Sequence, residues 1–307
     1  MTGILSKYVS KIFIQQWTIG IAQATIKDII KNKLFDPEIK WFPIQSKNKF
    51  SADPFLYKTK EGNYAILIEE YSFSSGYGII SLMLLDKYFN TTENKVLLDT
   101  NSHLSYPFIF SEYGKTYVFP EASQSGKLSC YEYDIENKSF IFLKDLIELP
   151  LLDSTIFKYN NKYWLFATLN GIDADNKLYI YFSDSLLGTY IPHAKNPVKT
   201  GITSTRPAGN LIEVDGVFYR PSQNSKYTYG GSITINRLLF LDESDFKEEF
   251  YMSIYINGKR KSNRGMHGIH TLNCVDDTIV VDGTKWRFSL TIKLKQISDK
   301  LFRRDSR

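Results

Sequence analysis

The sequence predicts an all-β protein, a five-bladed β-propeller with a short N-terminal strand and helix. The first observation behind this prediction is a strand-like segment that recurs five times, about every fifty residues. The second is that a polar turn and another strand-like run follow each copy, so every repeat opens with a hairpin. Fixed-period hairpins are typical of repeat folds whose sheets surround a central channel.

The five opening segments share an apolar strand pattern but begin with different polar residues. They lie at 53–57, 106–110, 153–157, 206–211 and, more loosely, 270–273, and their partner runs lie at 63–67, 115–119, 162–166, 217–220 and 278–281. The first strand of each propeller blade lies nearest the axis, so the opening residues should converge at one mouth of the channel. The second strand returns antiparallel, and its end should reach the same mouth.

We expect one domain over residues 1–307, with a closing segment at 1–50 and blades that begin near 51, 103, 152, 204 and 265. Residues 11–20 are predicted to form a strand, and residues 24–31 have apolar residues near helical spacing. If the N-terminal strand joins the last blade, the ring closes and no sheet edge is left exposed.

The composition narrows the class of partner. The formal net charge is +5, and no Lys/Arg-dense run with interleaved aromatics indicates a nucleic-acid surface. The basic tail at 300–307 is a candidate contact with an acidic membrane face, with solubilising disorder as the alternative. The 21 Tyr, 21 Phe and 4 Trp suit β-strands, and a carbohydrate cleft is the second explanation. Trp17 is expected in the core, with a sugar platform as the alternative.

The sequence also predicts where the protein resides. Its two cysteines lack a CxxC partner, the N-terminus lacks the apolar core of a signal peptide, and no run approaches the roughly twenty apolar residues of a membrane span. We therefore expect a cytoplasmic protein, with the inner face of the membrane as a candidate place of peripheral association.

The predicted mouth collects polar and charged side chains, which is the default pattern of an active site. The candidate catalytic residues are Asp53, Asp153 and Glu121. The ends of the second strands add Glu69 and Glu70 from blade one. The candidate substrate-binding residues are Arg206, Arg220, Tyr106, His103, Gln223, His267 and His270. The alternative for the aspartates is a structural role, because Asp often bonds nearby backbone N–H groups at strand starts.

The order of short motifs resembles a known family. The motifs are 17–21, 52–56, 103–108 with 120–123, 153–157 with 163–166, 185–188, 192–193, 196–198, 206–209, 219–223, 229–230, and 270–273 with 281–283. Together they cover nearly the whole chain. They resemble the five-bladed superfamily of arabinanases, levansucrases and invertases, including glycoside hydrolase family 43. The similarity is closer to the N-terminal domain of plant glucosamine inositolphosphorylceramide transferase and its stand-alone bacterial counterparts.

The resemblance implies roles for two aspartates and departs at a third position. Family 43 hydrolases use an aspartate base in blade one and an orienting aspartate in blade three, which match Asp53 and Asp153. Their blade-four motif is Glu-Gly-Pro, whereas this chain has Arg206-Pro-Ala-Gly209. Arginine cannot protonate an alkoxide leaving group, so hydrolysis would need Glu121 as the acid. An arginine instead suits phosphate oxygens.

These considerations favour a glycosyltransferase-like enzyme that moves a sugar from a nucleotide donor to a surface glycan or glycolipid. Asp53 would be the base, Asp153 would orient the donor, and Arg206 and Arg220 would hold phosphate. A hydrolase or phosphorylase that uses Asp53 with Glu121 and a non-catalytic glycan-binding propeller are the alternatives. No cofactor is assigned with certainty. A divalent metal held by oxygen ligands is a candidate. The DxD pattern at 173–175 lies in a polar stretch for which a turn is the favoured interpretation.

Overall fold

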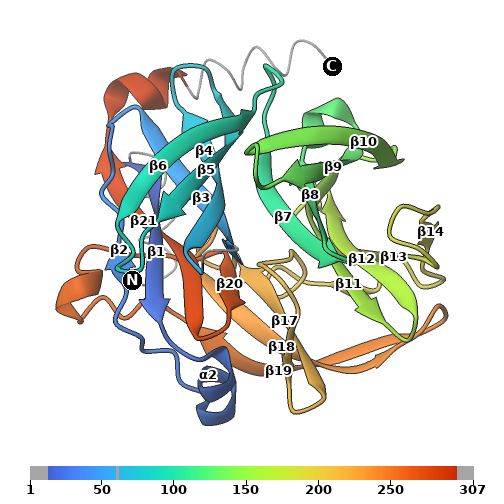
Figure 1. Ribbon diagram of the computed structural model, residues 1–307. Coiled ribbons are helices and arrows are strands. Elements are labelled where there is room, and N and C mark those ends of the chain that lie inside the picture. The colour runs from blue at the N-terminus through green and yellow to red at the C-terminus, as the bar shows by residue number, and fades with distance from the viewer. Residues whose placement is uncertain (1–12, 60–61, 296–307) are drawn as a thin grey trace.

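The computed structural model describes residues 13–59 and 62–295, and its strands form five sheets arranged in a ring (Figure 1). The prediction of an all-β five-bladed propeller is therefore confirmed. The predicted basic tail at 300–307 lies outside the described residues. Within the described part of the chain, no helix has the length and apolar character needed to cross a membrane.

The first four blades follow one another along the chain. Blade one contains β3 (Lys49–Lys58), β4 (Tyr64–Ser72), β5 (Tyr77–Leu85) and β6 (Thr91–Leu98). Blade two contains β7 (Ser105–Glu112), β8 (Lys115–Glu121), β9 (Leu128–Asp134) and β10 (Ser139–Ile147). Blade three contains β11 (Leu151–Tyr159), β12 (Lys162–Leu169), β13 (Lys177–Ser183), β14 (Ile191–Pro192) and β15 (Lys199–Thr200). Blade four contains β16 (Ile212–Val214), β17 (Val217–Asn224), β18 (Ser232–Leu241) and β19 (Phe246–Ile254).

Blade five joins the two ends of the described chain. It contains β20 (Leu272–Val275), β21 (Thr278–Phe288), β1 (Phe13–Gln23) and β2 (Lys40–Trp41). β1 and β21 pair antiparallel along their whole length, from Phe13 opposite Phe288 to Gln23 opposite Thr278. The ring thus closes as predicted, and β21 is an inner strand of the sheet with both edges paired.

One short α-helix and two 3₁₀ turns lie in the connections between strands. α2 (Ile26–Asn32) lies close to the predicted 24–31, and it buries Ile29 and Ile30 against blades four and five. Two 3₁₀ turns, η1 (Ser123–Ser125) and η2 (Lys261–Asn263), complete the elements.

The apolar core lies between neighbouring blades. One cluster joins blades one to three around Phe55, Phe108 and Leu151, and another joins blades five and one through Ile19 and Val280. The remaining two clusters join blades three and four and blades four and five. Around the axis, β3 packs against β7 and β20, and β7 packs against β11. The strand starts that carry the candidate site are therefore brought together at the centre.

Candidate active site at the axis of the propeller

The strands nearest the axis in blades one, two and three share a backbone distortion at the first residue of the repeated segment. Asp53, Tyr106 and Asp153 have φ angles of 50°, 41° and 49°, in the left-handed region that non-glycine residues rarely adopt. In each blade the pairing between the first and second strands shifts register at this point. Such a bulge redirects the local backbone and side chain. Left-handed non-glycine residues cost about 1–3 kcal/mol each and cluster at functional sites.

The distorted residues donate their backbone N–H groups to carboxylates of the preceding blade. The N–H of Tyr106 donates to Asp53 Oδ2 at 3.2 Å, and that of Asp153 donates to Glu121 Oε2 at 3.1 Å. The N–H of Asp53 donates to Asp282 Oδ2 at 3.2 Å. The carboxylates of blades five, one and two are thus linked by one repeated backbone device.

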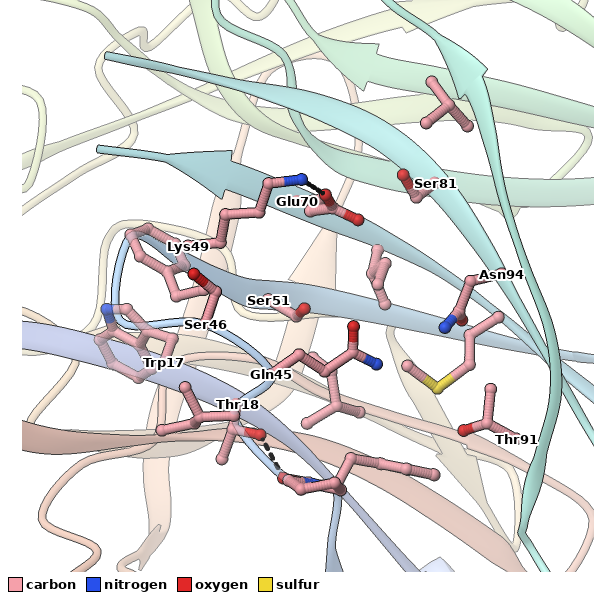
Figure 2. A pocket seen from close by; sticks show the side chains of 18 of the residues that line it. Trp17, Thr18, Gln45, Ser46, Lys49, Ser51, Glu70, Ser81, Thr91 and Asn94 are labelled. Carbon is pink, nitrogen blue, oxygen red and sulfur yellow. Dashed lines mark hydrogen bonds and ion pairs between the residues drawn. The ribbon is translucent and has the colours of Figure 1, made fainter. Parts of the chain in front are cut away.

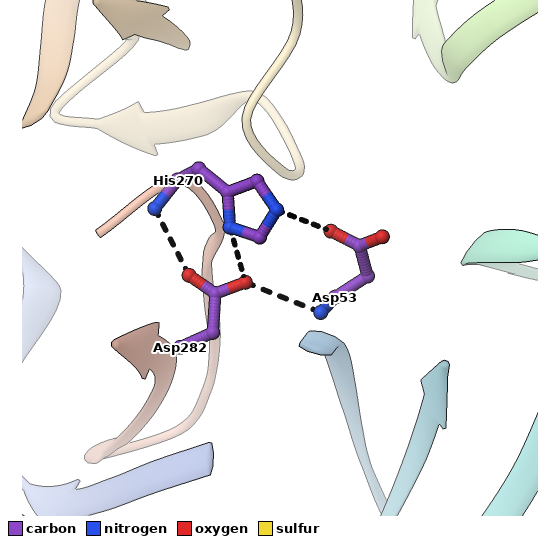
Figure 3. Close-up of side chains that lie close together, drawn as sticks. All are labelled: Asp53, His270 and Asp282. Carbon is purple, nitrogen blue, oxygen red and sulfur yellow. Dashed lines mark hydrogen bonds and ion pairs between the residues drawn. The ribbon is translucent and has the colours of Figure 1, made fainter. Parts of the chain in front are cut away.

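Blade five contributes a buried histidine between two aspartates (Figure 3). His270 Nδ1 lies 2.5 Å from Asp282 Oδ2, and its Nε2 lies 3.5 Å from Asp53 Oδ1. Asp282 also accepts the backbone N–H groups of His270 and Thr271, at 2.9 and 3.0 Å. The Thr271 hydroxyl donates to Asp53 Oδ1 at 2.9 Å. Trp17 stacks on the imidazole, with ring centroids 4.0 Å apart.

Blade four holds the carboxylate of blade three. Arg206 Nε lies 2.5 Å from Asp153 Oδ2, and Gln223 Nε2 donates to the same oxygen at 2.6 Å. The guanidinium also contacts Asp175 Oδ1 at 3.2 Å and lies 4.0 Å from Glu121 Oε2. Arg206 is therefore surrounded by three acidic side chains, and one of them, Asp175, lies in the stretch that the sequence predicted to be a turn.

Two glutamates are buried near these aspartates. Burial, followed by the charge of Asp153, raises the pKa of Glu121 to about 8 although Arg206 opposes the shift. Burial also raises the pKa of Glu69 well above its usual range, and the carboxylates of Asp53 and Glu121 add to that effect. Glu121 is therefore largely protonated at pH 7.

The pKa values of Asp53 and His270 are both raised, and each results from opposing effects of burial and charge. Burial raises the pKa of Asp53 to about 6, with His270 opposing and Asp153 and Asp282 adding to the shift. Burial lowers the pKa of His270, but the carboxylates of Asp282 and Asp53 outweigh it, so the pKa is raised above its ordinary value. Of the two acids, Asp53 therefore loses its proton at a lower pH than Glu121.

The site also contains a candidate metal-ligand group. Asp53, His270 and Asp282 each offer one ligand atom, and these atoms lie within 4.8 Å of one another. A divalent ion here would compete with the proton that the raised pKa places on His270. The three residues thus offer the donor atoms of a divalent-ion site, and loss of the proton from His270 would accompany binding of an ion.

Six of the ten predicted site residues come together in this cluster. They are Asp53, Glu121, Asp153, Arg206, Gln223 and His270. His103 lies at its border, because its Nδ1 is 3.8 Å from Glu69 Oε1 and accepts the N–H of Gly78 at 3.0 Å. His267 is exposed on the loop before His270.

The structure places Arg220 and Tyr106 differently from the prediction. Arg220 does not reach the cluster: its buried guanidinium forms two hydrogen bonds to Glu248, at 2.9 and 2.6 Å, and donates to the carbonyls of Ser204 and Thr205. Strand residues alternate between faces, so Arg220 and Gln223, three apart on β17, point to opposite sides.

Tyr106 takes part in the site through its backbone only. Its side chain is fully buried, and its hydroxyl accepts the N–H of Gly209 at 2.7 Å and contacts Thr155 Oγ1 at 2.9 Å. The expected role as a substrate-binding side chain is therefore replaced by a structural bond across three blades.

The prediction missed Asp282, although the sequence carried a signal for it. Glu69, Glu121 and Gln223 all stand near the end of the second strand of their hairpins. Asp282 lies in the middle of β21 (Thr278–Phe288), but it directly follows residues 278–281, the second-strand run that the sequence predicted for the fifth hairpin. The same rule, applied to blade five, would have found it.

Comparisons with known proteins agree with this architecture. Residues 42–284 match the sequence model of the family described as "Glucosamine inositolphosphorylceramide transferase 1, N-terminal". The curated protein of that name from Arabidopsis thaliana is 30% identical over 227 residues, which are 72% of this chain and 30% of the relative. The one from Oryza sativa subsp. japonica is 32% identical over 207 residues, 66% of this chain and 28% of the relative. The chain thus spans less than a third of the length of these relatives.

Solved structures show the same fold at low sequence identity. A family 117 glycoside hydrolase from Zobellia galactanivorans has a TM-score of 0.55 and 12% identity, covering 92% of each chain. An exo-β-1,3-galactanase from Phanerochaete chrysosporium has a TM-score of 0.52 and 13% identity, covering 66% of this chain and 52% of the other. On the evidence of the family match over residues 42–284, this chain belongs to the family of the N-terminal domain of glucosamine inositolphosphorylceramide transferase 1.

Proposed function

We propose that this chain catalyses glycosyl transfer at the axial cluster, from an activated donor sugar to a hydroxyl group of a glycan or glycolipid. The observation that carries the proposal is the convergence of Asp53, Glu121 and Asp153 at the axis, each held by backbone or side-chain donors of a neighbouring blade. Burial raises the pKa of Asp53 to about 6 and that of Glu121 to about 8. Two such groups with separated pKa values are the usual signature of an acid and a base in one site. The transferase name of the plant relatives adds support.

In the proposed step Asp53 is the base. It takes the proton of the acceptor hydroxyl while that oxygen bonds to the anomeric carbon and the bond to the leaving group breaks. Asp53 already accepts bonds from Thr271 and from the N–H of Tyr106, and a carboxylate can accept about four hydrogen bonds, so capacity remains for the acceptor. Asp153 would stabilise positive charge on the sugar ring, and Glu121 would supply a proton to a leaving oxygen that needs one.

The net charge of the axial cluster affects which donor sugar it can bind. Carboxyl groups outnumber the cations Arg206 and His270, and Arg206 is already occupied by acids. A nucleotide diphosphate would therefore need a divalent cation, or release of Arg206 from Asp153, to bind here. The relatives are named for glucosamine, and an amino sugar with a free ammonium group would be favoured by this excess of carboxylates.

A hydrolase or phosphorylase is the second candidate, and the raised pKa of Glu121 favours it. A protonated glutamate is what cleavage of an unactivated glycosidic bond requires. Water or phosphate would then take the place of the acceptor hydroxyl, with Asp53 as the base for water.

A ligand screen followed by product analysis tests these alternatives. Thermal shifts of the chain are measured with nucleotide sugars, free nucleotides, phosphate and simple sugars, with and without Mg²⁺ or Mn²⁺, since a ligand at a hundred times its Kd adds about 2.7 kcal/mol. Stabilisation by one nucleotide and its sugar conjugate, followed by sugar transfer to a lipid or glycan acceptor, supports the transferase. Free sugar released in water, or a sugar phosphate released with phosphate, supports the second candidate.

A further inference from the structure

A cleft of about 510 Å³ lies at the boundary between blades five and one, outside the carboxylate cluster (Figure 2). It is bounded by β1, by residues 42–46, and by β3 to β6 of blade one. Its volume falls within the range of small-molecule sites. Nothing in the proposed chemistry of Asp53 and Glu121 uses this cleft.

The lining combines uncharged hydrogen-bonding groups with apolar surfaces. Gln45 comes from the 42–46 segment, Ser51 from β3 and Asn94 from β6 (Figure 2). The hydroxyl of Ser81 also lines the cleft; it is buried, with 2% of the residue exposed, and has no hydrogen-bond partner. An unpaired buried hydroxyl costs free energy, so a ligand that bonds it would recover that cost.

The charged groups of the cleft already have bonding partners. Lys49 Nζ lies 2.6 Å from Glu70 Oε1, and both residues line the cleft. Lys95 donates to the carbonyl oxygens of Asn137 and Lys138, at 3.4 and 3.0 Å. A phosphate or carboxylate would have to compete with these partners. Amides and hydroxyls beside aromatic and aliphatic surfaces suit an uncharged polyol better.

The cleft is held in shape by its own scaffold. Gln16 is buried and donates to the carbonyls of Ser46 and Lys49, both at 2.7 Å, which fixes the two ends of the loop. Thr18 donates to the carbonyl of Phe42 at 2.7 Å. A site ordered before binding loses little conformational entropy when a ligand binds.

Trp17 connects the cleft to the carboxylate cluster. It lines the cleft and also stacks on His270 at 4.0 Å between ring centroids. The adjacent glutamates of β4 point to opposite faces of the strand, with Glu69 in the cluster and Glu70 in the cleft. Trp17 is therefore the side chain that the two places share, and a chain of sugar units that reached both would pass beside its ring.

We propose that this cleft is a binding site for a neutral saccharide, which would be a sugar unit of the acceptor glycan next to the reacting one. The acceptor role rests on the proposed function, whereas the binding of a neutral saccharide does not. Because an aromatic ring, two amides and hydroxyls face the ligand, several weak contacts would combine to set its orientation.

The test measures binding of a panel of neutral oligosaccharides, with uronate-bearing and sulfated counterparts, to the full chain by isothermal titration calorimetry. We expect a neutral member to bind, and Gln45→Leu and Asn94→Leu each to weaken that binding about tenfold or more. Both positions are exposed, so the fold should survive. Asn170→Leu, at an exposed loop of blade three away from the cleft, is the matched control and should bind like the wild type.

Asp53→Asn separates this proposal from the catalytic one, because it should bind the same oligosaccharide while transfer is lost. Binding that is unchanged in both cleft variants, a preference for the anionic counterparts, or no binding of any neutral member would overturn the saccharide site. Retained cleft binding in a wild-type chain that forms no transfer product would count against the proposed function only.

Discussion

The backbone N–H of Tyr106 donates a hydrogen bond of 3.2 Å to Oδ2 of Asp53, so the opening residue of blade two orients the proposed base of blade one. The left-handed φ of 41° at Tyr106 accompanies this arrangement, and the same device recurs at Asp53 and Asp153. Backbone donors of this kind need no particular side chain. A tyrosine can therefore occupy the position and place its ring in the core.

Replacing Glu121 should change how stability depends on pH. The folded-state pKa of about 8 lies above the ordinary value of 4.5, so the folded chain binds this proton more tightly than the unfolded chain. This contribution is fully present below pH 4.5 and is lost as the pH rises towards 8. We expect Glu121→Gln to lose less stability than the wild type between pH 5 and 8.5, as measured by urea unfolding. Equal slopes in the two proteins would show that Glu121 does not titrate there.

Removing Arg206 should be strongly destabilising. Arg206→Ala leaves the buried Asp153 without its cation, and breaking a buried pair in this way costs about 3–5 kcal/mol of unfolding free energy. Arg237→Ala is the control, because its pair with Glu249 at 3.6 Å is exposed and should contribute under about 1 kcal/mol. Denaturant unfolding of both variants measures the difference. A similar small loss in both would argue against a buried ion pair at Arg206.

Asp282 should act as a positioning residue for His270. Asp282→Asn removes the negative charge next to Nδ1, so the pKa of His270 should fall towards or below its ordinary value. NMR titration of the imidazole nitrogens measures this shift directly. Asp277→Asn, at the exposed turn of the same hairpin, should leave the titration unchanged. An unshifted His270 in Asp282→Asn would contradict the assigned contact.

The N-terminal strand should contribute substantially to stability. Ile19 is fully buried between blades five and one, and truncation of such a residue costs about 2–5 kcal/mol. We expect Ile19→Ala to lose that amount in denaturant unfolding, while Ile141→Ala, which is 52% exposed on β10, loses far less. Losses of the same size at both positions would contradict closure of the ring by β1.

The repeated hairpins were sufficient to predict the five blades and their closure by an N-terminal strand. They also predicted much of the cluster, because first-strand starts and second-strand ends must meet at one mouth. The rule failed at Arg220, where strand alternation directs the side chain to the other face. It overlooked Asp282 because the fifth repeat is the loosest.

The rest depends on features that a single sequence does not contain. The residues around Tyr106 do not predict a left-handed backbone or a buried side chain at that position. The contact of Asp175 with Arg206 joins a loop of blade three to blade four and depends on the three-dimensional arrangement of those blades. The cleft beside Trp17 likewise depends on how β1 sits against blade one.

The most direct test of the account compares the wild type with Asp53→Asn, using the donor identified by the ligand screen. Substrate binding is measured by calorimetry and product formation by mass spectrometry. The account predicts comparable binding and a rate about 100-fold or more below the wild type, as expected for loss of a general base. A rate equal to that of the wild type would contradict the role of Asp53 and with it the proposed function of the cluster.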